Sequence, residues 1–169
     1  MSREPGKLMQ WLSKLIPQPN GVNNLTPSEP KRTLKEEDFR AEGVYYYEDN
    51  IRKLACPNPE WKKSAAKIVE EGNTGKRIFK HNYVNRPVKL LEQPGNPNDP
   101  NAVAVIIAGE LVGYIGRDDN AKVRDILHNR EIIYISGFIG GGDYKVIGDD
   151  KKIFKDSRGF YVNIRIKYI

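Results

Sequence analysis

Residues 96–118 read NPNDPNAVAVIIAGELVGYIGRD, and this stretch decides the fold. Ala102 to Ile107 is an unbroken apolar run that is too short for a typical helix, which predicts a strand buried on both faces. Gly109-Glu110 is expected to turn the chain into a second strand, Leu111 to Ile115, so that the two strands form a hairpin. Asp118 or Asp119 is then expected to cap a helix that runs to about His128.

Further strands are predicted on both sides of this hairpin. Phe39 to Tyr47 is rich in β-branched and aromatic residues and reads as a strand with Gly43 inside it. From Phe160 to Tyr168, apolar side chains alternate with polar or aromatic ones, which predicts a strand with one face in the core. The other expected strands are Pro87 to Glu92, Glu131 to Ile139, and Asp143 to Ile147 after a reversal at Gly140-Gly141-Gly142; Lys76 to Tyr83 is ambiguous.

One more helix is expected before the central segment. Asn58 is a suitable N-cap, Pro59 fits the first helical position, and Gly72 fits the C-terminal cap. The helix would place Trp61, Ala65, Ile68 and Val69 on one face. Several short strands with few helices predict a mainly β, α+β fold: a small OB-like six-stranded β-barrel with a helical insertion and an N-terminal extension.

The N-terminal part differs in character from the rest. Leu8, Trp11, Leu12 and Leu15 recur at helical spacing, which predicts a short amphipathic helix over residues 7–16, and a Pro-rich linker follows. A helix of this length is marginal alone in water, so it either docks on the domain or binds a partner. We therefore divide the chain into an extension, residues 1–36, and a barrel domain, residues 37–169.

Composition excludes several classes of site. Cys56 is the only cysteine and His81 and His128 are the only histidines, so no disulfide, metal site or cofactor is expected, and a reducing cytoplasm fits. No run of 18 apolar residues exists, so no membrane partner is expected. The formal net charge of +6 favours a polyanion, but half of it lies in residues 1–36. A nucleic-acid site on the barrel must therefore be a local patch.

At this point the motifs resemble a known family. Gly43-Val44-Tyr45-Tyr46-Tyr47, the run from Asn96 to Val105, and Val112-Gly113-Tyr114-Ile115 with a helix after it are similar, in order and spacing, to the HIRAN domain. That domain occurs at the N-terminus of the helicase-like transcription factor and as a free-standing bacterial protein. The resemblance covers about residues 39–169, and the helix around Trp61 looks like that of the free-standing bacterial members.

The resemblance implies a non-catalytic, OB-like DNA-binding module. In the eukaryotic example it holds a single-stranded 3′ end and helps to remodel stalled replication forks. Its binding residues, carried over by position, are Tyr45, Tyr46, Asn98, Asp99, Arg117, and Phe138 or Ile139. The implied partner is single-stranded DNA or a DNA 3′ end in repair or replication.

Each candidate also has a structural interpretation that the sequence leaves open. Asp99 is able to accept a hydrogen bond from a terminal hydroxyl, but it equally fits a role in bonding the local backbone of the Pro-rich turn. If Tyr45, Tyr46 and Tyr47 alternate along a strand, one or two of them point into the core. Arg117, Lys122 and Arg124 suit either phosphate or a solvated helix face. The three glycines suit a hairpin connection or an amide nest for phosphate.

Two other function classes remain. A protein-interaction adaptor would use the 7–16 helix as a ligand and the barrel as a scaffold. A magnesium-dependent nuclease would use Asp99, Asp118 and Asp119, although no recognisable motif completes such a site.

Overall fold

The computed structural model describes residues 32–169 of the 169-residue chain. The predicted helix over residues 7–16 lies outside the described residues, as does most of the linker after it. The first described strand begins at Lys35, close to the predicted start of the barrel domain.

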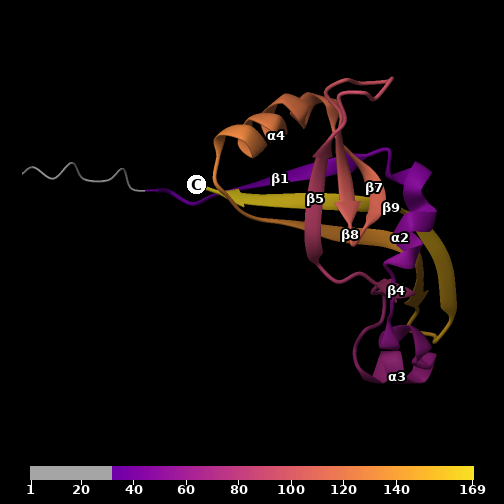
Figure 1. Cartoon of the computed structure of the whole chain (residues 1–169). Helices are drawn as coiled ribbons and strands as arrows, with labels where there is room; N and C mark the ends of the chain where they lie inside the picture. Colours follow the sequence, from indigo (N-terminus) through magenta and orange to yellow (C-terminus); the bar gives the residue numbers. More distant parts are fainter. Residues whose placement is uncertain (1–31) are drawn as a thin grey trace, which may run out of the picture. The chain divides into compact units, whose positions relative to one another are not determined.

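Six strands form a closed antiparallel β-barrel (Figure 1). Their order around the barrel is β8, β5, β6, β7, β1, β9, and pairing between β9 and β8 closes the ring. The predicted six-stranded, mainly β architecture is confirmed. The barrel strands are β1 (Lys35–Glu42), β5 (Arg86–Glu92), β6 (Val103–Ile107), β7 (Glu110–Ile115), β8 (Ile132–Ile147) and β9 (Ile153–Tyr168).

The core follows the two strongest patterns of the sequence. On β9, Val162, Ile164 and Ile166 are fully buried, as the alternation predicts. On β6, consecutive residues Val103 to Val105 are all fully buried, so both faces of this strand are covered. The turn from β6 to β7 lies at Ala108-Gly109, one residue earlier than predicted, and both residues have positive φ (48° and 88°), as a tight two-residue hairpin turn requires.

Strand β1 is shorter than the sequence suggests. The predicted strand to Tyr47 is wrong: β1 ends at Glu42, and Gly43 adopts a left-handed conformation with φ 67°. Residues Val44–Tyr47 then form a 3₁₀-helix, η1, which leads into α2 (Glu48–Lys53). A strand cannot continue through this φ, so the aromatic residues after Gly43 leave the sheet despite their high β-propensity.

The helical insertion is also divided differently from the prediction. One helix was expected, but Pro59–Lys62 is a 3₁₀-helix (η2) capped by the Asn58 side chain, and α3 (Ala65–Glu70) starts anew with Ser64 as its N-cap. Lys63 between them is extended, which breaks the helix. The ambiguous segment that follows forms the short strands β3 (Ile78–Phe79) and β4 (His81–Asn82), and β4 pairs with β2 (Cys56–Pro57).

A buried lysine attaches this insertion to β8. Lys145 is 5% exposed, and its ammonium group donates hydrogen bonds to the carbonyls of Trp61 (2.7 Å) and Lys63 (3.0 Å). Burial lowers the pKa of Lys145. Ile68, Ile78 and Ile147 form a second small core beside it. Strands β8 and β9 extend together beyond the barrel, and the insertion packs against this extended part (Figure 1).

The three glycines do not reverse the chain, so the predicted hairpin at Gly140–Gly142 is wrong. Strand β8 runs straight through them to Ile147, with an irregular register between Gly140 and Gly142, and the turn to β9 comes only after Ile147. The glycines are there for close packing. A Cβ atom at Gly140 would lie 2.3 Å from the Tyr161 ring, and one at Gly141 (φ 101°) would lie 2.4 Å from the Gly159 carbonyl oxygen.

Helix α4 (Arg117–Asn129) lies over one end of the barrel (Figure 1). Its N-cap is Gly116 rather than the predicted Asp118 or Asp119, and no side chain caps it. Val123 and Ile126 are buried in the barrel core. Among the described residues, no helix has the length and apolar composition needed to cross a membrane.

The packing around Gly141 yields a stability test. We expect Gly141→Ala to lower the free energy of unfolding by about 1–3 kcal/mol, because the new methyl group meets backbone and φ stays positive. Urea denaturation measures this change. The matched control is Gly159→Ala on the facing strand, where a Cβ meets nothing within 4 Å; it should change stability by less than about 0.5 kcal/mol. Equal effects of the two substitutions would contradict the packing argument.

Candidate functional site

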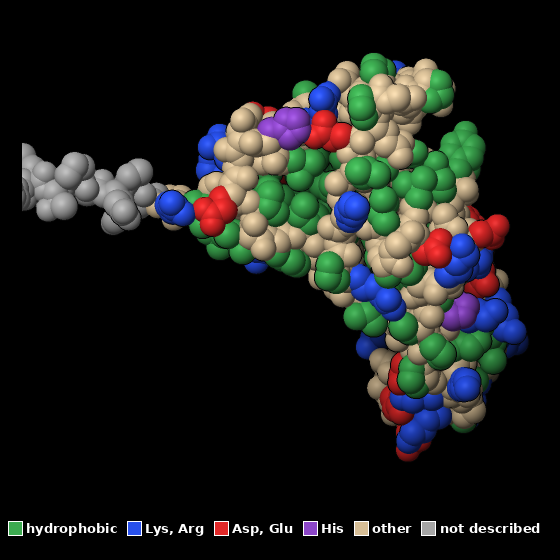
Figure 2. All heavy atoms as spheres, in the orientation of Figure 1, with side chains coloured by type: hydrophobic (Ala, Val, Ile, Leu, Met, Phe, Trp, Pro, Cys, Tyr) green, Lys and Arg blue, Asp and Glu red, His purple; other side chains and the backbone are tan. Residues whose placement is uncertain are grey.

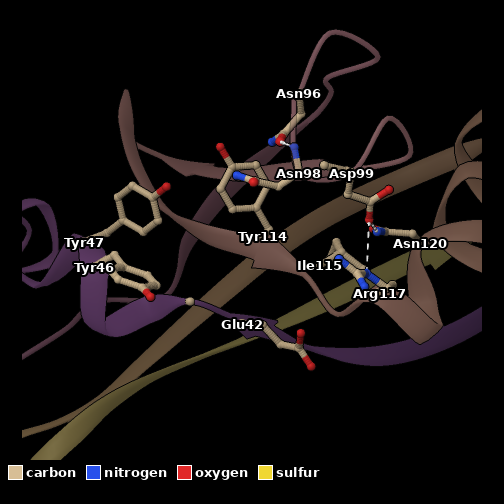
Figure 3. A pocket seen from close by; sticks show the side chains of 12 residues that line it. Glu42, Tyr46, Tyr47, Asn96, Asn98, Asp99, Tyr114, Ile115, Arg117 and Asn120 are labelled. Carbon is tan, nitrogen blue, oxygen red and sulfur yellow. Dashed lines mark hydrogen bonds and ion pairs between the residues drawn. The ribbon is translucent and has the colours of Figure 1, made fainter.

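A pocket of about 410 Å³ forms where four segments meet (Figure 3). These are the β1–η1 junction with Glu42, Tyr46 and Tyr47, the turn with Asn96, Asn98 and Asp99, the end of β7 with Tyr114, and the start of α4 with Arg117 and Asn120. The pocket thus brings together four of the residues predicted from the sequence: Tyr46, Asn98, Asp99 and Arg117. We call it the end pocket below.

Asp99 has one carboxylate oxygen in the turn and one toward α4. Oδ1 accepts a hydrogen bond from the Asn101 backbone N–H at 2.8 Å, so the turn-forming interpretation is correct. A similar bond from the Asn98 N–H to Asn96 Oδ1 (2.9 Å) shapes the preceding turn. Oδ2 faces Asn120 Nδ2 at 3.1 Å and Arg117 Nε at 3.8 Å. Asp99 therefore uses one carboxylate oxygen to shape the turn, while its second oxygen lies beside the pocket.

Asn120 also lines the end pocket, and the sequence does not single it out. It is 3% exposed, its Nδ2 donates to Asp99, and its Oδ1 has no hydrogen-bond partner within residues 32–169. It lies three residues before Val123, on the buried side of α4. An asparagine at this spacing on an apolar helix face is the only signal in the sequence that could have identified it.

The tyrosines lie differently from the strand-based expectation. Because Tyr45 and Tyr46 belong to η1, neither is in the core: they are 65% and 72% exposed, with ring centroids 3.8 Å apart. Their contact raises the pKa of Tyr45. Tyr46 lines the end pocket, whereas Tyr45 lines an adjacent groove. Tyr46 thus offers an exposed ring to a ligand in this pocket.

Two further tyrosines form the inner wall of the pocket. Tyr47 is half-buried, and burial, followed by the neighbouring Tyr114 hydroxyl, raises its pKa. The Tyr114 hydroxyl donates to Gln93 Oε1 at 3.1 Å, and its ring centroid lies 6.2 Å from that of Tyr47. These rings give the pocket a rigid aromatic wall.

The charge of the pocket does not suit a phosphate clamp. Two carboxylates, Glu42 and Asp99, face one cation, Arg117, whose side chain is 77% exposed. The other cations considered on this helix are engaged elsewhere: Lys122 pairs with Glu37, and Arg124 pairs with Glu92 (2.8 Å). In its chemistry the pocket therefore suits a neutral group that donates hydrogen bonds and stacks on tyrosine.

The remaining predicted residues, Phe138 and Ile139, lie outside the end pocket. Phe138 is 49% exposed on the outer face of β8 and lines a separate groove. Ile139 is 4% exposed and packs in the barrel core, so its side chain is not available to a ligand.

The acidic residues considered for magnesium do not form a cluster. Within residues 32–169, no group of three or more His, Cys, Asp or Glu side chains is arranged to hold a metal ion. Asp99 is engaged with the turn and with Asn120 instead.

The contact between Asp99 and Asn120 yields a pH-dependent prediction. In Asn120→Asp, burial and the facing carboxylate should raise the pKa of the new carboxyl above its unfolded value of about 3.9. The variant should lose about 2 kcal/mol or more of unfolding free energy at pH 7, with the loss shrinking as pH falls toward 4. Thermal unfolding at both pH values checks this.

The control for this prediction is Asn85→Asp, the same substitution at an exposed position. It should change stability by less than about 0.5 kcal/mol at either pH. A loss in Asn120→Asp that is the same at pH 7 and pH 4 would argue against repulsion between the carboxylates.

Comparison with protein families matches one domain. The HIRAN domain matches residues 73–153, which include the Pro-rich turn, the β6–β7 hairpin, α4 and all of β8. No curated protein and no solved structure matches the chain. HIRAN domains are nucleic-acid-binding modules. The match includes two of the three motifs that carry the resemblance in the sequence, the run from Asn96 and the Val112–Ile115 segment, and it is consistent with a HIRAN-family protein.

Proposed function

We propose that the end pocket binds the free 3′ end of single-stranded DNA, and that the protein is a non-catalytic binding module. The observation that carries the proposal is the placement of Asp99: one oxygen is fixed in the turn, the other accepts a single hydrogen bond, from Asn120, and keeps a second acceptor position beside the pocket, and an exposed tyrosine ring lies across from it (Figure 3).

The chemistry of a terminal nucleotide matches this arrangement. A carboxylate repels phosphate, so its use in a DNA site is to accept a hydrogen bond from a neutral donor. The hydroxyl of a free 3′ end is such a donor, and an internal nucleotide of DNA has no equivalent group. Asp99 would therefore distinguish an end from an internal position.

The other residues fit the remaining parts of the nucleotide. Tyr46 presents a ring on which the terminal base stacks, and Arg117 reaches the phosphate on the 5′ side of the terminal sugar. Asn98 lines the same pocket from the turn. A module with this specificity would act where free 3′ ends arise, as in DNA repair and replication.

The proposal predicts a preference for a free 3′ hydroxyl. Fluorescence anisotropy should show tighter binding of a short 5′-labelled oligothymidine than of the same oligonucleotide ending in a 3′-dideoxy nucleotide, which lacks only the hydroxyl. Asp99→Asn should remove this preference, worth about 10- to 150-fold for a hydrogen bond to a charged group. The amide oxygen still accepts the turn bond from Asn101.

Controls separate this effect from general changes in charge. Asp118→Asn removes a charge from an exposed neighbouring residue outside the pocket and should keep the end preference. Tyr46→Ala should weaken binding of both oligonucleotides by the worth of one base stack, about 1–3 kcal/mol. Equal binding of hydroxyl and dideoxy ends by the unaltered protein would refute end recognition.

A further inference from the structure

A second groove system begins next to the end pocket and follows the outer face of β1, β9 and β8. The first groove, of about 350 Å³, shares Glu42 and Gly43 with the end pocket and continues past Tyr45 to Tyr161. The next, of about 240 Å³, starts at Tyr161 and continues to Phe138. The two grooves meet at the Tyr161 side chain, which lines both, and we call this succession of grooves the path.

Aromatic side chains follow one another along this path. Tyr161 on β9 and Phe138 on β8 both point outward from the barrel, and their ring centroids are 6.1 Å apart. The Tyr161 ring lies against Gly140, where any side chain would collide with it. Together with the exposed Tyr45, they provide successive flat surfaces of the kind on which bases stack.

Unpaired cations border the same path. Arg40 on β1 lines the groove beside Tyr161, and the Arg158 guanidinium lies 5.6 Å from the Tyr161 ring centroid. Within residues 32–169, neither arginine is in an ion pair. A path with free arginines and aromatic rings has the composition of a single-strand binding groove.

Some of the other basic side chains are neutralised by ion pairs. On the same face, Arg165 pairs with both Asp38 (2.7 Å) and Glu36 (2.9 Å). On the insertion around α3, Lys and Arg are mixed with Asp and Glu (Figure 2), and Lys63 there pairs with two glutamates. Among residues 32–169, Arg77 beside the Tyr144 ring is also outside any ion pair, but the groove at Tyr161 is bordered by two such arginines.

We propose that this path, from Tyr45 through Tyr161 to Phe138, binds the nucleotides that precede the 3′ end, with Tyr161 as a base-stacking platform and Arg40 and Arg158 as phosphate contacts. The inference rests on the proposed function for its direction: the 3′ end lies in the end pocket and the strand extends in the 5′ direction. The footprint should be about four nucleotides or more, within the usual range for an OB-type barrel.

The length of the oligonucleotide tests the path separately from the end. Anisotropy titrations with 5′-labelled dT2, dT4, dT6 and dT8, all with a free 3′ hydroxyl, should show affinity that rises beyond dT2. Tyr161→Ala should weaken dT8 binding by about 5- to 150-fold, the worth of one base stack, and leave dT2 binding unchanged. Tyr161→Phe should retain the dT8 affinity because the ring remains.

The matched control is Phe154→Ala, which removes an exposed aromatic ring from the same strand, away from the path. Circular dichroism and thermal unfolding of Tyr161→Ala establish that the barrel is intact. A loss of dT8 affinity in Phe154→Ala as large as that in Tyr161→Ala would show that the effect is not specific to the path, and the proposal would be wrong.

Salt dependence tests the arginines. For dT8, Arg40→Gln should reduce the slope of log K against log salt concentration by about 0.7, the value for one phosphate contact on a single strand, with no change for dT2. Lys89→Gln on β5 removes an exposed charge that is not in an ion pair within residues 32–169, and it should leave the slope as it is.

The outcomes distinguish this inference from the function on which it rests. Affinity that rises with length without a hydroxyl preference would support the path and refute end recognition. A hydroxyl preference with the same affinity for dT2 and dT8 would support end recognition and refute the path. An equal loss for dT2 and dT8 in Tyr161→Ala would also overturn the path.

Discussion

Strand β9 is hydrogen-bonded on both sides, and the rest of the structure depends on this double pairing. On one side it joins β1, from Arg40 opposite Asn163 to Lys35 opposite Tyr168, and on the other it joins β8 over nearly its whole length. The inner half of the β8–β9 ladder closes the barrel. The outer half supports the insertion, through β3 and Lys145. One continuous ladder therefore holds together two structural units with separate hydrophobic cores.

The elements that follow a regular side-chain pattern could be predicted from the sequence. The buried run of β6, the alternation of β9 and the inward residues of α4 all depend on burial at a fixed period, which the sequence shows directly. The aromatic run after Gly43 could not be assigned this way, because one backbone conformation at Gly43 outweighs the β-propensity of three tyrosines. The glycine run in β8 could not be interpreted correctly from the sequence because its cause, the close approach of Gly159, Phe160 and Tyr161 on β9, lies in a distant part of the chain.

The same distinction applies to the site. Asp99 and its neighbours could be identified as candidate site residues from the sequence, because one short Asn- and Pro-rich segment both forms the turn and contains the family motif. Asn120 could not, because its importance arises only when α4 packs over the turn. The exposure of Tyr46 likewise depends on the 3₁₀-helix rather than on residue type.

Charge is divided between two parts of the barrel surface. The end pocket contains two carboxylates and a single arginine, whereas the neighbouring face of β1, β9 and β8 has free arginines beside aromatic rings. Attracting a polyanion requires positive charge, whereas recognising a hydroxyl group requires an acceptor such as a carboxylate. A carboxylate repels the polyanion, so the two functions place opposite demands on local charge. Placing them on adjacent surfaces allows both.

The turn bond of Asp99 has a consequence for the energetics of binding. A carboxylate on a mobile loop would have to give up rotational freedom when a ligand arrives, and that loss reduces affinity. Here the backbone N–H of Asn101 and the amide of Asn120 already fix the orientation of the Asp99 side chain. The entropy is lost when the protein folds rather than when it binds, so the Asp99 carboxylate is preorganised for the proposed ligand.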